Sequence, residues 1–149
     1  FNTAPEDMHL AERLFGLLGK TWTIEEAMMP LATAVAGTGP ALSCYLIERG
    51  RIDYRHMPPA QRKRLASDLA DAAKKTGFNI EGIDALTEGI VNGVIHLLNE
   101  KHLTPSALRK RITSQRGTTE AALAVLHEGG TLSEALEAAK KRAEALSGG

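Results

Sequence analysis

The sequence has few of the residues that mark a disulfide-rich, zinc-binding or nucleic-acid-binding domain. One of its 149 residues is cysteine, Cys44, which excludes an internal disulfide and a cysteine-rich zinc site. Aromatic residues make up 4% of the chain, too few for a surface on which nucleic-acid bases stack. Eighteen Lys and Arg balance eighteen Asp and Glu, so no net charge attracts nucleic acid or a membrane surface.

Several sequence patterns are also missing, and each narrows the expected function. No G-x-G-x-x-G or G-x-x-x-x-G-K-[ST] turn lies between a strand and a helix, so we expect this chain alone to bind no nucleotide cofactor. No histidine pair has the spacing of metal ligands, so we expect no metal site. No apolar run reaches the roughly 18 residues of a membrane span, and no signal peptide is visible, so we expect a cytoplasmic protein without a membrane partner.

Helix-forming residues dominate the chain, and the sequence therefore predicts an all-α fold. One short strand is expected, at residues 20–24. Helices are expected at residues 6–18, 25–36, 40–47, 60–76, 79–101, 104–112, 120–128 and 131–147. Their boundaries rest on capping residues and on glycine or proline breaks, with Thr104 and Thr131 as the clearest N-caps.

The helix expected at residues 79–101, capped by Asn79, indicates self-association. It is apolar on more than one side, and it contains Gly82, Gly89 and Gly93, which each cost about 1 kcal/mol of helix propensity relative to alanine. Glycines at these positions favour close packing of the backbone against another helix. Because the helix after Pro40 is also apolar almost all round, one chain has too few elements to cover both, and we expect an obligate dimer.

The most informative candidate site is the loop Ser114-Gln-Arg-Gly-Thr-Thr119. A helix N-terminus carries unpaired N–H groups and partial positive charge, and Ser, Gly and Thr before it allow an anion to approach closely. We expect Ser114, Gly117, Thr118 and Thr119 to bind a small carboxylate or a phosphate. The alternative interpretation is that Thr118 or Thr119 only caps the helix while Gly117 makes the turn.

A second helix start with the same properties lies at Gly37-Thr-Gly-Pro40, where Thr38 and Gly39 are the candidate binding residues. Its alternative interpretation is an ordinary turn between two helices. The basic residues between Arg49 and Arg64 form a separate cluster that suits either nucleic acid or a solvated helix face. The low aromatic content and the balanced charge favour the solvated face.

Four stretches together resemble the C-terminal half of a pyrroline-5-carboxylate reductase, over residues 7–146. The most specific one runs from Leu108 to Gly130 and is similar to the family's pattern L-R-x-x-V-T-S-P-G-G-T-T…L-E-x-G-G. The others are Leu14–Lys20 with Trp22–Ile24, Ala36–Ala41 (G-S-G-P-A in the family), and Leu69–Ala72 with the helix after Gly77.

The resemblance implies an interlocking helical dimer, possibly a further assembly into decamers, and an enzyme that reduces pyrroline-5-carboxylate to proline with NADP or NAD as cofactor. Residues 1–24 would be the end of a dinucleotide-binding domain, and residues 25–149 the dimerisation domain. Ser114, Gly117, Thr118 and Thr119 would hold the substrate carboxylate. The resemblance assigns no catalytic residue in this chain, which by itself is expected to be inactive.

Two departures from the family pattern affect this expectation. Gln115 and Arg116 replace the Pro-Gly of the loop, and Arg116 adds bulk where glycine would let a ligand approach. The chain also has an insertion that we place between Arg49 and Arg64. These departures leave open an alternative function, a non-catalytic helical dimerisation module that diverged from the family.

Overall fold

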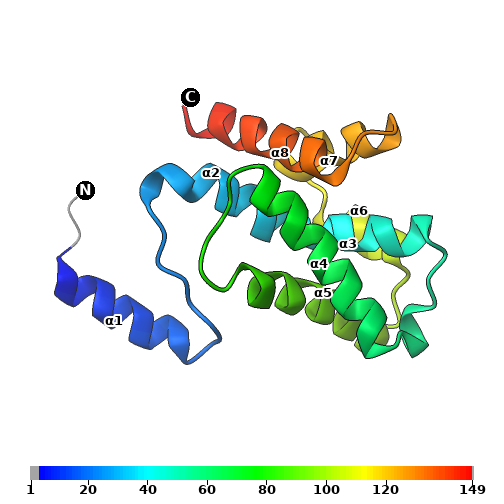
Figure 1. Ribbon diagram of the computed structural model, residues 1–149, viewed down its shortest axis with the longest axis horizontal. Helices are drawn as coiled ribbons and strands as arrows, with labels where there is room; N and C mark the ends of the chain where they lie inside the picture. Colours follow the sequence, from blue (N-terminus) through cyan, green and yellow to red (C-terminus); the bar gives the residue numbers. More distant parts are fainter. Residues whose placement is uncertain (1–3, 149) are drawn as a thin grey trace.

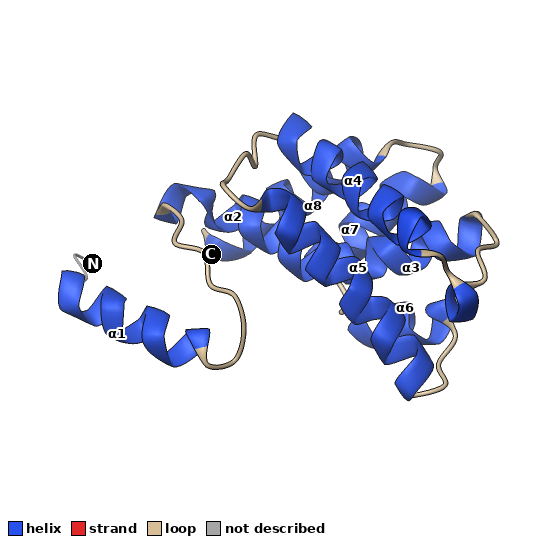
Figure 2. Ribbon diagram, turned by 60° about the horizontal axis from the view of Figure 1, so that its bottom comes forward, coloured by secondary structure: helices blue, strands red, loops and turns tan. Residues whose placement is uncertain are grey.

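The computed structural model describes residues 4–148, which form helices joined by short connections (Figures 1 and 2). The predicted all-α class is confirmed. Residues 1–3 and 149, which fall within the predicted domains 1–24 and 25–149, lie outside the described residues. The elements are α1 (Pro5–Gly16), η1 (Glu26–Met28), α2 (Met29–Ala32), η2 (Thr33–Gly37), α3 (Thr38–Arg49), η3 (Tyr54–His56), α4 (Pro59–Lys75), α5 (Ile83–Glu100), α6 (Pro105–Ile112), α7 (Thr118–His127) and α8 (Leu132–Ser147).

Helix α3 lies at the centre of the bundle and contacts α4, α5, α6, α7 and α8. Its buried residues belong to both hydrophobic clusters. One cluster fills the space between α2, η2, α4, α7 and α8, and the other fills the space between α3, α4, α5 and α6. Leu42 belongs to the first cluster, whereas Cys44 and Ile47 belong to the second. Helix α3 therefore packs against both α6 and α7, the helices on either side of the candidate loop.

The chain from Glu26 to Arg49 forms one continuous helical segment. The predicted break at residues 37–40 is wrong. Pro40 cannot donate to the carbonyl of Ala36, and its ring would crowd that carbonyl in a regular α-helix. The wider π-helical turn η2, which comes immediately before α3, accommodates the proline without ending the helix.

This segment is long and apolar enough to cross a membrane by length and composition, so the expectation that no segment reaches that length is wrong. Residues 27–47 of this segment carry no charge, but most of them are small. The segment therefore lacks the run of large apolar side chains by which a membrane span is usually identified in a sequence. Within the protein, 56% of its most apolar window is buried inside the bundle. A core helix of a water-soluble protein passes the same test.

Helix α5 begins at Ile83, four residues after the predicted cap Asn79. The N-cap is Gly82, whose φ of 81° is a left-handed conformation that favours glycine. The preceding residues form a turn that buries Phe78 against the core. A helix neighbour was expected at Gly89 and Gly93, but a Cβ at either position would have no other described atom within 4 Å.

Helix α1 lies at one end of the molecule, away from the bundle (Figure 1). None of its residues is buried, and it exposes an apolar face that includes Leu14 and Phe15. The strand expected at residues 20–24 is not formed, because an extended segment becomes a strand only when a second strand pairs with its backbone. Half-buried Trp22 instead packs its ring over Gly82 at the start of α5.

Two predicted N-caps are confirmed. Thr104 accepts a hydrogen bond from the N–H of Ala107 at 3.2 Å and starts α6. Thr131 and Glu134 form a reciprocal capping box at the start of α8. They cap the helix that precedes the candidate loop, α6, and the last helix, α8.

Candidate functional site

The start of α7 has a different geometry from the capped start of α8. Gly117 is the N-cap and has no side chain to accept a hydrogen bond, so no described side chain caps the first turn. Thr118 and Thr119 lie inside this first turn, which rules out the interpretation that either of them is the N-cap. The N–H groups of Thr118, Thr119 and Glu120 therefore lack the intrahelical acceptors that later residues have.

One part of the prediction for this loop is wrong. Gly117, one of the expected binding residues, has no free N–H group, because its N–H donates to the carbonyl of Ser114 at 3.1 Å. A Cβ at residue 117 would overlap the hydroxyl of Ser114 and lie 3.1 Å from its carbonyl oxygen. The loop folds closely onto itself here, so glycine fits this position better than a residue with a side chain.

The structure brings the two candidate helix starts together. The hydroxyl of Thr38 donates to the hydroxyl of Thr118 across 3.4 Å, although the residues are 80 positions apart in the sequence. Thr38 is fully buried, Thr118 is half-buried and Thr119 is 5% exposed. Because the helix continues through η2 into α3, Thr38 and Gly39 do not stand at a free helix N-terminus, and that part of the prediction is wrong.

Gly39 has a packing role in this arrangement. A Cβ at this position would lie 3.1 Å from Ile90 and 3.4 Å from Leu69. The glycine therefore allows α3 to approach α5 and α4 closely. This contact places Thr38, one residue earlier, at the depth in the bundle from which it reaches α7.

Arg116 has a left-handed backbone conformation, with φ of 57°. Its N–H donates to a carboxylate oxygen of Glu120 at 2.8 Å, and its carbonyl accepts a hydrogen bond from Nε of Arg142 at 2.6 Å. The side chain itself is exposed and makes no hydrogen bond or ion pair with the described residues. The loop is thus closed through the backbone of Arg116.

Arg109 on α6 ties this side of the site to α3 and α7. Its guanidinium lies 2.8 Å from Glu48 and 3.3 Å from Nε2 of His127, and it is 5.9 Å from the centroid of the Tyr45 ring. Because an arginine can only donate, Nε2 of His127 is the acceptor in this contact. The hydroxyl of Thr113, at the start of the loop, donates to the carbonyl of Arg109 at 2.7 Å.

Cys44 lies beside this cluster and is fully buried. Burial raises the pKa of its thiol to about 12, and the nearby carboxylate of Glu48 adds to this rise while Arg109 opposes it. A thiol with such a pKa is almost entirely protonated at neutral pH, so it packs in the core and does not act as a nucleophile.

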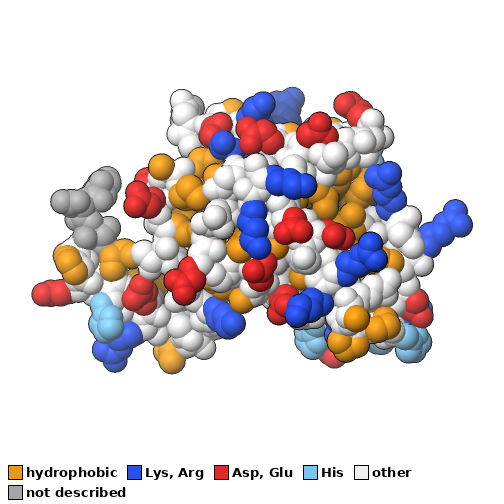
Figure 3. Space-filling view, in the orientation of Figure 1, with side chains coloured by type: hydrophobic (Ala, Val, Ile, Leu, Met, Phe, Trp, Pro, Cys, Tyr) orange, Lys and Arg blue, Asp and Glu red, His pale blue; other side chains and the backbone are white. Residues whose placement is uncertain are grey.

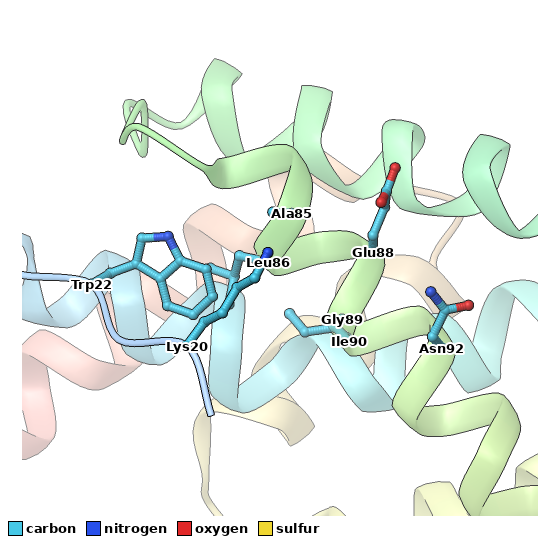
Figure 4. Close-up of a pocket in the computed structure, with 8 residues that line it drawn as sticks. All are labelled: Lys20, Trp22, Ala85, Leu86, Glu88, Gly89, Ile90 and Asn92. Carbon is cyan, nitrogen blue, oxygen red and sulfur yellow. The ribbon is translucent and has the colours of Figure 1, made fainter. Parts of the chain in front are cut away.

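A hollow of about 530 Å³ lies elsewhere, between the segment that precedes η1 and one face of α5 (Figure 4). Lys20 and Trp22 line one side, and Leu86, Gly89 and Ile90 lie on the opposite side. None of the predicted site residues lines this hollow. It lies along the face of α5 that carries Gly89, which we call the open face of α5.

The basic residues between Arg49 and Arg64 do not form one separate patch. Nε of Arg62 donates to the carbonyl of Met57, and the guanidinium of Arg55 lies over the ring of Tyr54. Lys and Arg alternate with Asp and Glu over the face in Figure 3. Within residues 4–148, no group of three or more His, Cys, Asp and Glu side chains is arranged to hold a metal ion.

Sequence reasoning missed two residues that shape the loop. Glu120 lies three residues after the N-cap Gly117, which is the spacing of a capping-box glutamate and was therefore visible in the sequence. Arg142 is 26 residues away from the carbonyl that it binds, and no local pattern marks it.

The described fold and site define an all-helical domain with an uncapped helix N-terminus beside a buried threonine. Residues 58–146 match the family model described as pyrroline-5-carboxylate reductase dimerisation. The chain therefore belongs to the pyrroline-5-carboxylate reductase family, and this part of it is the dimerisation domain.

Curated relatives with this name come from bacteria and plants. The chain is 30% identical over 146 residues to pyrroline-5-carboxylate reductase 1 of Bacillus spizizenii, covering 95% of this chain and 43% of the relative. It is 33% identical over 147 residues to the enzyme of Mycobacterium tuberculosis (95% and 48%) and 30% identical over 145 residues to that of Glycine max (95% and 46%). The chain thus spans less than half the length of these relatives. No solved structure gives a significant match.

Proposed function

We propose that this chain is the self-associating domain of a pyrroline-5-carboxylate reductase and that it binds the carboxylate of the substrate at the start of α7. The observation that carries the proposal is the uncapped first turn of α7, where Thr118 and Thr119 lie inside the helix instead of capping it. The same segment carries the motif that resembles the family's carboxylate-binding loop.

The chemistry of this turn suits a carboxylate. The first N–H groups of α7 carry partial positive charge and seek acceptors, and the half-buried hydroxyl of Thr118 lies among them. A carboxylate supplies two oxygens that accept several such hydrogen bonds at once. The carboxylate of Glu120 accepts a hydrogen bond from the N–H of Arg116, which precedes the helix. It therefore leaves the N–H groups of the first turn of α7 available.

In the complete enzyme, a nicotinamide cofactor, NADPH or NADH, would supply a hydride to the C=N carbon of the cyclic imine. The described residues contain no strand followed by a glycine-rich turn and a helix, so they do not fit such a cofactor, and we assign none of them to it. The role that we propose for this domain is to hold the substrate by its carboxylate, which fixes the position of the ring.

Self-association is proposed to occur through the open face of α5. Gly89 and Gly93 have no close neighbour within the described chain, although glycines inside a helix usually permit close backbone contact. Leu97 continues this face and is 37% exposed. A second copy of the chain would supply the missing helix neighbour.

The carboxylate proposal is tested by titrating the isotope-labelled chain with L-proline and following its backbone amides by NMR. We expect Thr118, Thr119 and Glu120 to shift with a dissociation constant in the millimolar range, about 4 kcal/mol, because water still competes at this open site. The start of α8 is the internal control, since Thr131 and Glu134 already cap it. Equal shifts at both helix starts, or none at α7, would contradict the proposal.

A further inference from the structure

The hydroxyl of Thr38 has an unusual partner for a threonine in a helical segment. Two other buried helical hydroxyls donate to a carbonyl of their own helix: Ser43 donates to Gly39 at 2.9 Å and Thr87 to Asp84 at 3.1 Å. Thr38 instead donates to Thr118 on another helix, at 3.4 Å. It does so immediately after the π-helical turn η2, where the regular pattern of carbonyls is interrupted.

The burial of the two hydroxyls sets the direction of this hydrogen bond, because Thr38 is fully buried and Thr118 is its one side-chain partner among the described residues. A hydroxyl carries one proton, so a Thr118 oxygen that accepts from Thr38 keeps its own proton free to donate elsewhere. Thr38 is fully buried, whereas Thr118 is half-buried and lies in the uncapped first turn of α7. The free proton of Thr118 is therefore available on the accessible side of the pair.

We infer that Thr38 is a positioning residue that orients the Thr118 hydroxyl as a hydrogen-bond donor to the bound carboxylate. This inference rests on the proposed carboxylate site. Thr38 contacts no ligand itself and acts through Thr118.

The test compares three variants of the full chain in the L-proline titration. Thr38→Val keeps the branched shape but removes the donor, and we expect it to weaken proline binding by about five- to tenfold, the effect of losing one oriented hydrogen bond. Thr38→Ser keeps the donor and should bind within about twofold of the unmodified chain. Ser43→Ala removes a buried hydroxyl of the same helix that serves only its own backbone, and it should leave binding unchanged.

Unfolding midpoints of all three variants separate binding from folding. If Thr38→Val binds proline as well as the unmodified chain, or if Ser43→Ala weakens binding equally, Thr38 has only a structural role and the inference is wrong. Thr118→Val distinguishes the two claims. If it abolishes binding while Thr38→Val does not, the site stands and the inference alone fails. If the unmodified chain does not bind proline, both fail.

Discussion

Replacing Arg116 by glycine is expected to stabilise the domain. Arg116 has φ of 57°, a left-handed conformation that costs an ordinary residue about 1–2 kcal/mol and costs glycine almost nothing. Its two hydrogen bonds, to Glu120 and from Arg142, use only backbone atoms of residue 116, so the glycine variant keeps them. Glycine also occupies this position in the family motif.

The expected gain is smaller than the relieved strain. Glycine makes the unfolded chain more flexible, which costs roughly 0.4–1 kcal/mol, so the net stabilisation should be about 0.5–1 kcal/mol. For a domain of this size, that corresponds to a rise in Tm of about 1–4 °C. The control is Arg116→Ala, which removes the same exposed side chain but keeps the strained conformation.

The assay is denaturant unfolding of the three proteins at one fixed protein concentration, because self-association makes apparent stability depend on concentration. Arg116→Gly should be more stable than both the unmodified chain and Arg116→Ala, with an unchanged m-value. If the glycine variant is no more stable than the alanine variant, the left-handed conformation of residue 116 does not carry the strain that we assign to it.

Three further outcomes follow from the structure. The backbone and side chain of Thr131 hydrogen-bond to Glu134 and lower the pKa of this glutamate, so its stabilising contribution is present above about pH 4.5 and is lost as the pH falls through the lowered pKa. Unfolding measured from pH 7 to pH 3 should therefore show a shallower loss of stability for Glu134→Gln, and parallel curves would contradict this. Because burial raises the pKa of Cys44 to about 12, a disulfide reagent at pH 8 should react with the native protein only as fast as it unfolds, and immediate labelling would argue against burial. Arg109→Met leaves a half-buried carboxylate on α3 without its partner and should cost about 1–2 kcal/mol, less than a fully buried pair would, whereas exposed Lys110→Met should change stability by less than about 0.5 kcal/mol. Equal effects of these two substitutions would mean that the cluster around Arg109 does not stabilise the bundle.

Features set by a few neighbouring residues could be predicted from the sequence. Thr104 and Thr131 were identified as N-caps because a cap depends on a side chain and an N–H only two or three residues away. The all-α class followed from helix propensity and from the lack of strand-forming runs. The family resemblance likewise rested on local motifs, above all on residues 108–130.

Features that depend on distant contacts could not be predicted. The sequence indicated Thr38 and Thr118 as two separate helix starts, but only the packing of α3 against α7 brings their hydroxyls together. The continuity of the helix through Pro40 depends on a π-helical turn whose Ala34 and Val35 are buried in the core, and glycine and proline in the sequence favoured a break. A segment at residues 20–24 with strand-like composition stays single because no second strand pairs with it among the described residues.

Sedimentation velocity at micromolar concentration tests most directly whether this chain acts as a self-associating dimerisation domain. We expect a stable dimer, and we expect glutamate at Gly89 and Gly93 to shift the chain toward a folded monomer by placing charge on the open face of α5. The matched control is Ala124→Glu, an exposed small residue on α7, which should leave the dimer intact. A stable folded monomer of the unmodified chain would contradict self-association, and a dimer that withstands both glycine substitutions would contradict the proposed face.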